Sequence, residues 1–125
     1  MRRDAASAML GMNVEVDEPG RAIVSMTVRD DMLNGFAITH GGLVFALADT
    51  AFAIACNEDD RVTVASGADI TFLKSTGAGQ VLTATAERRV VSGRTGLYDV
   101  TVRDETGDIV AEVRGRSMIT NRTVS

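Results

Sequence analysis

A single carboxylate interrupts the most apolar segment of the chain. The run GGLVFALADTAFAIACN occupies residues 41–57, and Asp49 is the only formal charge between Asp31 and Glu58. An ionised carboxylate in an apolar environment is costly unless it is paired or hydrogen-bonded, and Asp is a weak helix former. Perturbed acids concentrate at active sites, so we interpret Asp49 as a candidate catalytic acid. The alternative is an Asp that caps a loop or pairs with a buried arginine.

The beginning of the same segment supplies a candidate hydrogen-bond donor. Gly41 and Gly42 follow His40 directly. A helix N-terminus carries unpaired N–H groups and the positive end of the helix dipole, which suit a developing oxyanion. Glycine also lets a substrate carbonyl approach the backbone closely. The alternative is a tight loop-to-helix turn. His40 and Asn34 have the same two interpretations, substrate positioning or turn formation, because Asn34-Gly35 is a turn-forming pair.

The spacing of these groups predicts a site built by two chains. Gly41 and Asp49 are eight residues apart, which is about 12 Å along a helix axis. One substrate carbon cannot contact both residues if they lie on the same helix. If both act on one carbonyl, the carboxylate comes from a second chain. Two antiparallel helices would then create two equivalent sites on a two-fold dimer.

Other chemistries have little support in the sequence. One histidine and one cysteine are too few for a protein-only zinc site. Cys56 has no second histidine as its base, and the serines at 66, 75 and 92 lack a nucleophile-elbow setting. The glycine motifs of nucleotide-binding proteins do not occur. We therefore expect neither a metal nor a cofactor.

Basic residues in the second half of the chain are candidates for binding a polyanionic ligand. They are Lys74, Arg88, Arg89 and Arg94. Arg94 lies in the turn SGRTG at residues 92–96, where glycines free backbone N–H groups for phosphate contacts. Solvated surface charge is the alternative for each of them.

Length and composition indicate one globular domain over residues 1–125, with 45% hydrophobic and 24% charged residues. A net charge of −4 and the absence of Trp disfavour nucleic-acid binding. The apolar stretch at 43–56 is too short to span a bilayer, and the first residues lack the apolar run of a signal peptide. A single cysteine fits a reducing compartment. We expect a cytoplasmic protein that binds neither nucleic acid nor membranes.

The elements that would position these residues are one buried helix and many strands. Residues 1–11 predict a lead-in helix ending at glycine, and residues 12–28 predict two strands around the turn at 17–20. The segment 41–57 is apolar on all sides, which predicts a helix buried on most sides. Residues 62–118 predict long hairpin strands, and 119–125 a tail. An antiparallel sheet covers such a helix only by curling around it, and the uncovered face favours a partner.

Two strings carry a resemblance to a known family. The first is MLNGFAITHGGLVFALADTAFAIACN, with the core N-G-x-x-x-x-H-G-G-x-x-x-x-L-A-D, and the second contains G-R-T-G-x-Y-D-V at residues 93–100. From about Leu10 to Met118 the chain resembles the PaaI-type acyl-CoA thioesterases, hydrolases linked to phenylacetic acid degradation. The resemblance implies an α+β hotdog fold: an antiparallel sheet wrapped around one long central helix. It also implies a homodimer with a continuous sheet, commonly paired into a homotetramer.

The resemblance also implies roles for individual residues. Asp49 would attack the thioester carbon or activate water, the Gly41 N–H would polarise the carbonyl, and Asn34 and His40 would position it. Substrate contacts would come from Gly42, Thr50 and Phe45, and contacts to the coenzyme A phosphates from Lys74, Arg88, Arg94 and Thr95. Many relatives have Arg-Pro where this chain has Lys74-Ser75, and lysine lacks the bidentate fork of arginine.

The expected reaction is hydrolysis of an aryl- or arylacetyl-CoA thioester to the free acid and coenzyme A. Coenzyme A is then part of the substrate, and no other cofactor is needed. Three phenylalanines, Phe36, Phe45 and Phe52, have two interpretations: a pocket that accepts an aromatic acyl group, or packing in the core. The alternatives are a hotdog-fold hydratase or dehydratase acting on acyl-CoA, and a non-catalytic acyl-CoA-binding protein.

Overall fold

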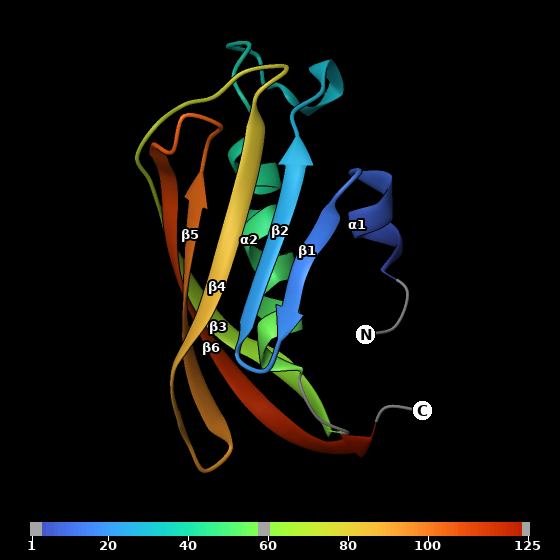
Figure 1. Ribbon diagram of the computed structural model, residues 1–125, viewed down its shortest axis with the longest axis vertical. Helices are drawn as coiled ribbons and strands as arrows, with labels where there is room; N and C mark the ends of the chain where they lie inside the picture. The colour runs from blue at the N-terminus through green and yellow to red at the C-terminus, as the bar shows by residue number, and fades with distance from the viewer. Residues whose placement is uncertain (1–3, 58–60, 124–125) are drawn as a thin grey trace.

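The computed structural model describes residues 4–57 and 61–123, and Figure 1 shows how its elements follow one another. A short helix and two strands precede the long helix, and four long strands follow it. The elements are α1 (Ala5–Met9), β1 (Asn13–Glu18), β2 (Arg21–Thr27), the 3-10 helix η1 (Asp30–Met32), α2 (Gly41–Cys56), β3 (Arg61–Phe72), β4 (Val81–Ser92), β5 (Thr95–Arg103) and β6 (Ile109–Thr123).

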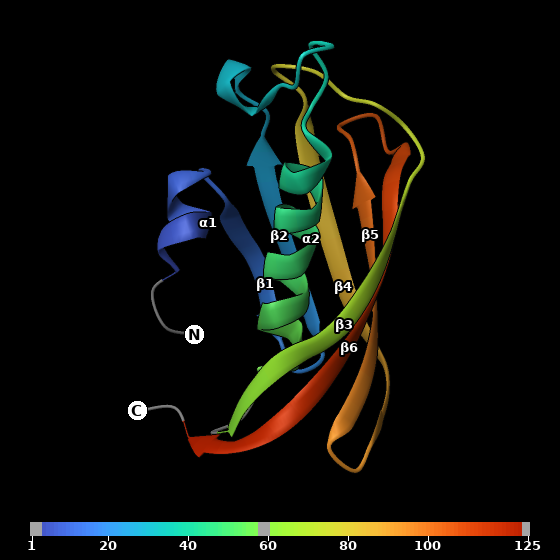
Figure 2. The ribbon, with the colours of Figure 1, turned by 180° about the vertical axis from the view of Figure 1, so that it is seen from behind.

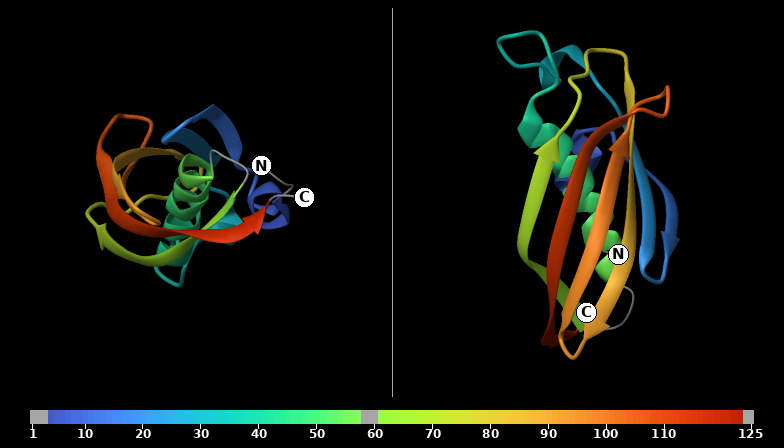
Figure 3. Two further views of the ribbon diagram at one scale, coloured as in Figure 1. Left: turned by 90° about the horizontal axis from the view of Figure 1, so that it is seen from below. Right: turned by 90° about the vertical axis from the view of Figure 1, so that its left-hand side faces the viewer.

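The six strands form one antiparallel sheet that curls around α2. Their order across the sheet is β1-β2-β4-β5-β6-β3. Seen along the helix, the sheet curves around one side of α2 (Figure 3, left). The view from behind shows α2 lying against the concave face of the sheet (Figure 2). The predicted α+β architecture, an antiparallel sheet wrapped around one long helix, is confirmed. In the described part of the chain, no helix has the length and apolar character needed to cross a membrane.

Small residues let the sheet approach the helix closely. In the register of β2 and β4, Ala22 pairs with Ala86 and Val24 with Ala84. All four side chains are fully buried, and they alternate with outward-facing residues as the period of a strand requires. Because small side chains project little from the sheet, α2 packs close to the backbone of these strands.

The inner face of α2 is held by an aromatic contact. Phe52 is 2% exposed, and its ring centroid lies 5.4 Å from that of Tyr98 on β5 at an interplanar angle of 55°. A Cβ added at Gly115 would lie 2.8 Å from the Phe52 ring, so β6 needs glycine at this position. Of the two interpretations of Phe52, the structure supports packing in the core: this ring lies between helix and sheet.

The opposite face of α2 is open. Gly42 and Asp49 are exposed in the single chain, whereas Phe45, Ala46 and Thr50 are partly buried. The prediction of a helix buried on most sides is therefore wrong for one chain. The partner that would cover the apolar residues on this face stays a prediction.

The ends of the chain differ from the sequence prediction. Asp4 caps the N-terminus of α1, and the helix ends at Met9. Gly11, which follows it, has a φ of 70°. β6 continues to Thr123, so residues 119–123 belong to a strand and not to the expected tail. The hydroxyl of Thr120 donates to the Val62 carbonyl at 2.6 Å, and this pairing with β3 holds the end of β6. Residues 1–3 and 124–125 lie outside the described residues.

Candidate active site

The N-terminus of α2 leaves one backbone donor available. His40 is the N-cap: its Nδ1 accepts the Gly42 N–H at 3.1 Å, and its carbonyl accepts the N–H groups of Leu43 and Val44. The Gly41 N–H has no acceptor among the described residues. The first N–H groups of a helix lie at the positive end of its dipole. Gly41 therefore offers a donor that is both unpaired and electrostatically suited to an anionic oxygen.

Gly41 lines a hollow of about 360 Å³. It is lined by Gly41 and Val44 of α2, by the loop before the helix and by the segment after β3: Asn34, Ile38, Thr39, Phe72, Leu73, Lys74, Ser75 and Thr76. The Phe72 ring lies against Gly41, because a Cβ added there would come within 3.1 Å of its Cζ. The sequence analysis missed Phe72. Nothing in the residues around Phe72 indicates a role in the site, since its contact with Gly41 depends on the tertiary fold.

Asn34 organises the loop that borders this hollow. Its Oδ1 accepts the N–H groups of Phe36 at 2.8 Å and Ile38 at 3.4 Å, and its own N–H donates to the Ile38 carbonyl. These bonds hold Ala37 at a φ of 60°, a conformation that favours glycine. Phe36, at the tip of the loop, is 87% exposed. Asn34 thus combines the two predicted roles: it forms the turn, and it lies in the wall of the hollow.

Asp49 lies outside that hollow, two turns further along α2. No hydrogen bond or ion pair joins its carboxylate to the described residues, so the structural alternatives of a loop cap or a buried arginine pair find no partner here. Although Asp49 is exposed at the surface of the single chain, the protein around its carboxyl partly removes it from water, which raises its pKa, and the charge of Asp4 adds to the effect. The single chain therefore separates the acid from the Gly41 donor, as the spacing in sequence predicts.

The neighbouring residues on α2 have structural contacts of their own. The Thr50 hydroxyl donates to the Ala46 carbonyl at 2.9 Å and contacts the Ser7 hydroxyl of α1 at 3.1 Å. Phe45 packs against the edge of the core. His40 and Gly42 line a second hollow of about 420 Å³, together with Asp31, Met32, Leu33 and Leu43. The contacts of substrate with Gly42, Thr50 and Phe45 stay a prediction.

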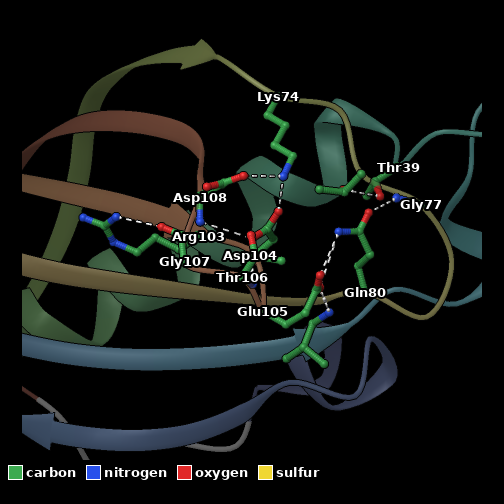
Figure 4. Close-up of polar contacts among 12 residues, drawn as sticks. Thr39, Lys74, Gly77, Gln80, Arg103, Asp104, Glu105, Thr106, Gly107 and Asp108 are labelled. Atoms are coloured by element: carbon green, nitrogen blue, oxygen red, sulfur yellow. Dashed lines mark hydrogen bonds and ion pairs between the residues drawn. The ribbon is translucent and has the colours of Figure 1, made fainter.

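Lys74 is held by two carboxylates, as Figure 4 shows. Its Nζ lies 2.6 Å from Asp104 Oδ2 and 2.8 Å from Asp108 Oδ2. Hydrogen bonds from Lys74 and Thr106 hold the pKa of Asp104 well below its usual range, and the two carboxylates raise the pKa of Lys74. Two acids against one lysine leave this cluster negatively charged, which does not favour a phosphate. These pairs support a structural role for Lys74 at the end of the β5–β6 hairpin, and its contact with the coenzyme A phosphates stays a prediction.

The other predicted phosphate-binding residues lie away from Gly41 in the single chain. Arg94 and Thr95 lie at the β4–β5 turn, at the opposite end of the molecule from the start of α2 (Figure 1). Arg94 donates to the Ile119 carbonyl at 3.2 Å and to Asn121 Oδ1 at 2.7 Å. Arg88 lies on β4, where it pairs with the buried Tyr98 of β5, and its side chain lies against Gly20 in the β1–β2 turn. One chain does not bring these residues to the hollow at Gly41.

Comparison with known proteins gives a clear result. The sequence profile of the thioesterase superfamily matches residues 36–111. The chain is 45% identical over 114 residues to acyl-coenzyme A thioesterase PaaI of Escherichia coli K12, a match that covers 91% of this chain and 81% of that protein. The solved structure of E. coli PaaI, from the phenylacetic acid degradation operon, matches with a TM-score of 0.94 at 43% identity, covering 98% of this chain and 88% of that one.

Two further solved structures are similar. One is a mutant of the phenylacetic acid degradation protein PaaI from Thermus thermophilus, with a TM-score of 0.87 and 36% identity over 92% of this chain and 98% of that one. The other is a Streptococcus mutans protein bound to acetyl-CoA, with a TM-score of 0.85 and 26% identity over 90% of this chain and 91% of that one.

These similarities define the class: the chain belongs to the thioesterase superfamily, and it is a thioester hydrolase with the hotdog fold. Within that superfamily it is of the PaaI type. The resemblance that the motif at residues 34–49 carries is therefore confirmed.

The cap of α2 leads to a prediction about stability. We expect His40→Ala to lower the free energy of unfolding by about 1 kcal/mol, because it removes the acceptor for the Gly42 N–H. His40→Asn should restore most of this loss, since Asn is a good N-cap. Denaturant titration at equal chain concentration measures both. An Ala variant as stable as the parent would contradict the capping role of this imidazole.

The ion pairs of Lys74 lead to a prediction about pH. The pKa of Asp104 is depressed in the folded chain, so the pairing stabilises the protein above about pH 4, the unfolded pKa of Asp, and this stabilisation is lost as the pH falls further. Lys74→Met should lower the Tm at pH 7 and weaken this acid dependence, with the KM for a coenzyme A thioester unchanged. Lys74→Arg is the control that keeps the charge. A raised KM with an unchanged Tm would restore the phosphate-binding prediction.

Proposed function

We propose that this protein hydrolyses acyl-CoA thioesters with an aryl or arylacetyl acyl group, releasing the free acid and coenzyme A. The observation that carries the proposal is the unpaired Gly41 N–H at the wall of a hollow. The similarity to E. coli PaaI supports coenzyme A thioesters as substrates, and the acetyl-CoA bound to the S. mutans protein supports the same fold as a binder of such thioesters. Phe72, which lies beside Gly41 and is 53% exposed, offers an apolar surface to the acyl group.

In the proposed mechanism the thioester carbonyl oxygen accepts the Gly41 N–H. This donor stabilises the negative charge that develops on the oxygen when the carbon is attacked. Asp49 of the partner subunit supplies the attack in one of two ways. It adds to the carbon, expels the coenzyme A thiolate and leaves a mixed anhydride that water hydrolyses; or it takes a proton from a water molecule that adds instead. Thiolate is a good leaving group, so neither route needs a metal or a further cofactor.

The proposed dimer follows from the open side of α2. The exposed Asp49 and the partly buried apolar residues around it would be covered by the α2 helix of a second copy, packed antiparallel. β3 lies at an edge of the sheet and is free to extend it. An antiparallel arrangement also brings the far end of the partner, with Arg94 and Thr95, toward the Gly41 side. We propose that these two residues and Arg88 meet the coenzyme A phosphates there, and that two dimers form a tetramer.

Mixing two inactive variants tests whether the site is shared. Chains with Asp49→Asn and chains with Gly41→Pro are co-expressed with different tags, and the mixed dimers are purified by both tags. If Gly41 of one chain works with the acid of the other, each mixed dimer holds one intact site and one doubly altered site. We expect about half of the parent activity per dimer. If both groups served one chain, no intact site would exist, and the mixed dimer would be inactive.

A substrate panel tests the acyl group. We expect kcat/KM to be higher for phenylacetyl-CoA and ring-hydroxylated phenylacetyl-CoA than for straight-chain acyl-CoA, with benzoyl-CoA as the shorter aromatic comparison. Crotonyl-CoA tests hydration on the same enzyme. Equal rates across the thioesters would contradict the aromatic preference, and hydration of crotonyl-CoA without hydrolysis would contradict the proposed reaction. The cap role of His40 Nδ1 already argues against using it as the base of a hydratase.

A further inference from the structure

A chain of hydrogen bonds joins α1 to the middle of α2. Asp4 caps α1: its Oδ1 accepts the Ser7 N–H at 3.0 Å, and its Oδ2 accepts the Ser7 hydroxyl at 2.6 Å. The Ser7 Oγ lies 3.1 Å from the Oγ1 of Thr50, which in turn lies 2.9 Å from the Ala46 carbonyl oxygen. Thr50 is the residue after Asp49. Figure 2 shows α1 lying beside α2 on the inner side of the sheet.

The strength of the individual hydrogen bonds favours one arrangement of the hydroxyl protons. The short bond to Asp4 takes the single hydroxyl proton of Ser7, because a bond to a carboxylate is the stronger one. The contact between the two hydroxyls must then use the proton of Thr50, which the Ala46 carbonyl shares. The bonds from Ser7 lower the pKa of Asp4, so the carboxylate that ends the chain is ionised at neutral pH.

The second observation concerns the charge near Asp49. Burial and the negative charge of Asp4 both raise the pKa of Asp49. The strands present mainly apolar side chains to α2 in the described residues; the titratable Tyr98 of β5 lies against Phe52, on the other side of the helix from the open face. Among the described residues of one chain, Asp4 is thus the charged group that adds to the effect of desolvation at Asp49.

We propose that α1 belongs to the catalytic apparatus, with Asp4 as a positioning residue that the Ser7–Thr50 contact holds near Asp49. The inference rests on the proposed function, in which Asp49 attacks the thioester or activates water. A nearby negative charge raises the proton affinity of a carboxylate. It therefore makes Asp49 a stronger base and a stronger nucleophile at neutral pH.

Asp4→Asn tests the proposal, because Asn caps helices as well as Asp does and keeps an acceptor for Ser7 while it removes the charge. We expect the acid limb of the kcat/KM profile to move to lower pH by about half a unit, and the plateau rate to fall about twofold. Glu87→Gln is the matched control. It removes one acid from the outer face of β4, away from α2, and should leave the profile unchanged.

A second readout does not depend on turnover. The Asp49 carboxyl carbon is followed by NMR titration, its signal assigned by its loss in Asp49→Asn. We expect its midpoint to move to lower pH in Asp4→Asn and in the same direction, by less, in Ser7→Ala. If Asp49→Asn is inactive while Asp4→Asn matches the parent in titration and pH profile, this proposal is overturned and the proposed function stands. If Asp49→Asn is active, the proposed function fails first, and the proposal fails with it.

Discussion

Asp49→Asn is expected to abolish almost all hydrolysis while the protein still folds and dimerises. The amide keeps the size of the side chain but neither attacks a thioester nor accepts the proton of water. We expect kcat to fall about 10³-fold or more, the size typical for loss of a catalytic base or nucleophile. Steady-state hydrolysis with a chromogenic thiol reagent measures the loss, and gel filtration checks the assembly.

The same substitution is expected to raise the stability of the protein. The pKa of Asp49 is raised in the folded chain, so folding favours the protonated carboxyl, and the ionised form costs stability as the pH rises through the folded pKa. The Asn variant avoids this cost. Its Tm should exceed that of the parent at pH 7, and the difference should shrink as the pH falls toward about 3, below the unfolded pKa of Asp.

Together the two measurements separate a catalytic acid from a structural one. A structural carboxylate contributes to stability, so its removal would lower the Tm, whereas a residue kept for chemistry is removed with a gain. Glu87→Gln serves as the control for simple removal of one negative charge. An Asp49→Asn enzyme with nearly parental kcat would remove Asp49 from the proposed mechanism, and a lowered Tm at pH 7 would show that the carboxylate contributes to stability.

The sequence predicted the helix and the strands because their signals are local. The apolar run at 41–57 begins with two glycines and ends with Asn57, and the structure begins α2 at Gly41 and ends it at Cys56 with Asn57 as the C-cap. The alternation in residues 21–28 has the period of a strand, and β2 occupies Arg21–Thr27. Such periods and caps depend on residues a few positions apart.

The partners of the charged residues could not be predicted in this way. Lys74 pairs with Asp104 and Asp108, about thirty residues later in the chain, and its sequence surroundings suggested a phosphate contact instead. Asp4 and Thr50 meet through Ser7 although they are far apart in sequence. These contacts exist because the curled sheet brings its hairpin ends and α1 to α2, and the register of a sheet follows from its turns and its burial pattern over the whole chain.

The burial of α2 shows a different limit. An apolar helix surface predicts burial but does not say which chain covers it. In one chain the sheet covers the face with Phe52 and leaves the face with Asp49 open. The prediction from sequence therefore gave α2 too many contacts within its own chain. The eight-residue spacing between Gly41 and Asp49 did predict that donor and acid lie apart in one chain.

Gly41→Pro is expected to remove the oxyanion donor and leave the helix in place. Gly41 is the first residue of α2 after the N-cap, a position where proline is well tolerated because its N–H has no partner within the helix. His40 has a ψ of 128°, the extended conformation that a residue before proline prefers. We expect kcat to fall about 10²- to 10³-fold, the usual cost of losing one oxyanion donor.

Gly41→Ala is the control that isolates the N–H, because it adds the same Cβ against the Phe72 ring and keeps the donor. The ring is half exposed, so it has room to shift by the few tenths of an ångström that the contact requires. We expect the Ala variant to stay within about tenfold of the parent, far above the Pro variant. If both variants lose activity equally, the crowding of Phe72 explains the loss, and the Gly41 N–H is not the group that polarises the carbonyl.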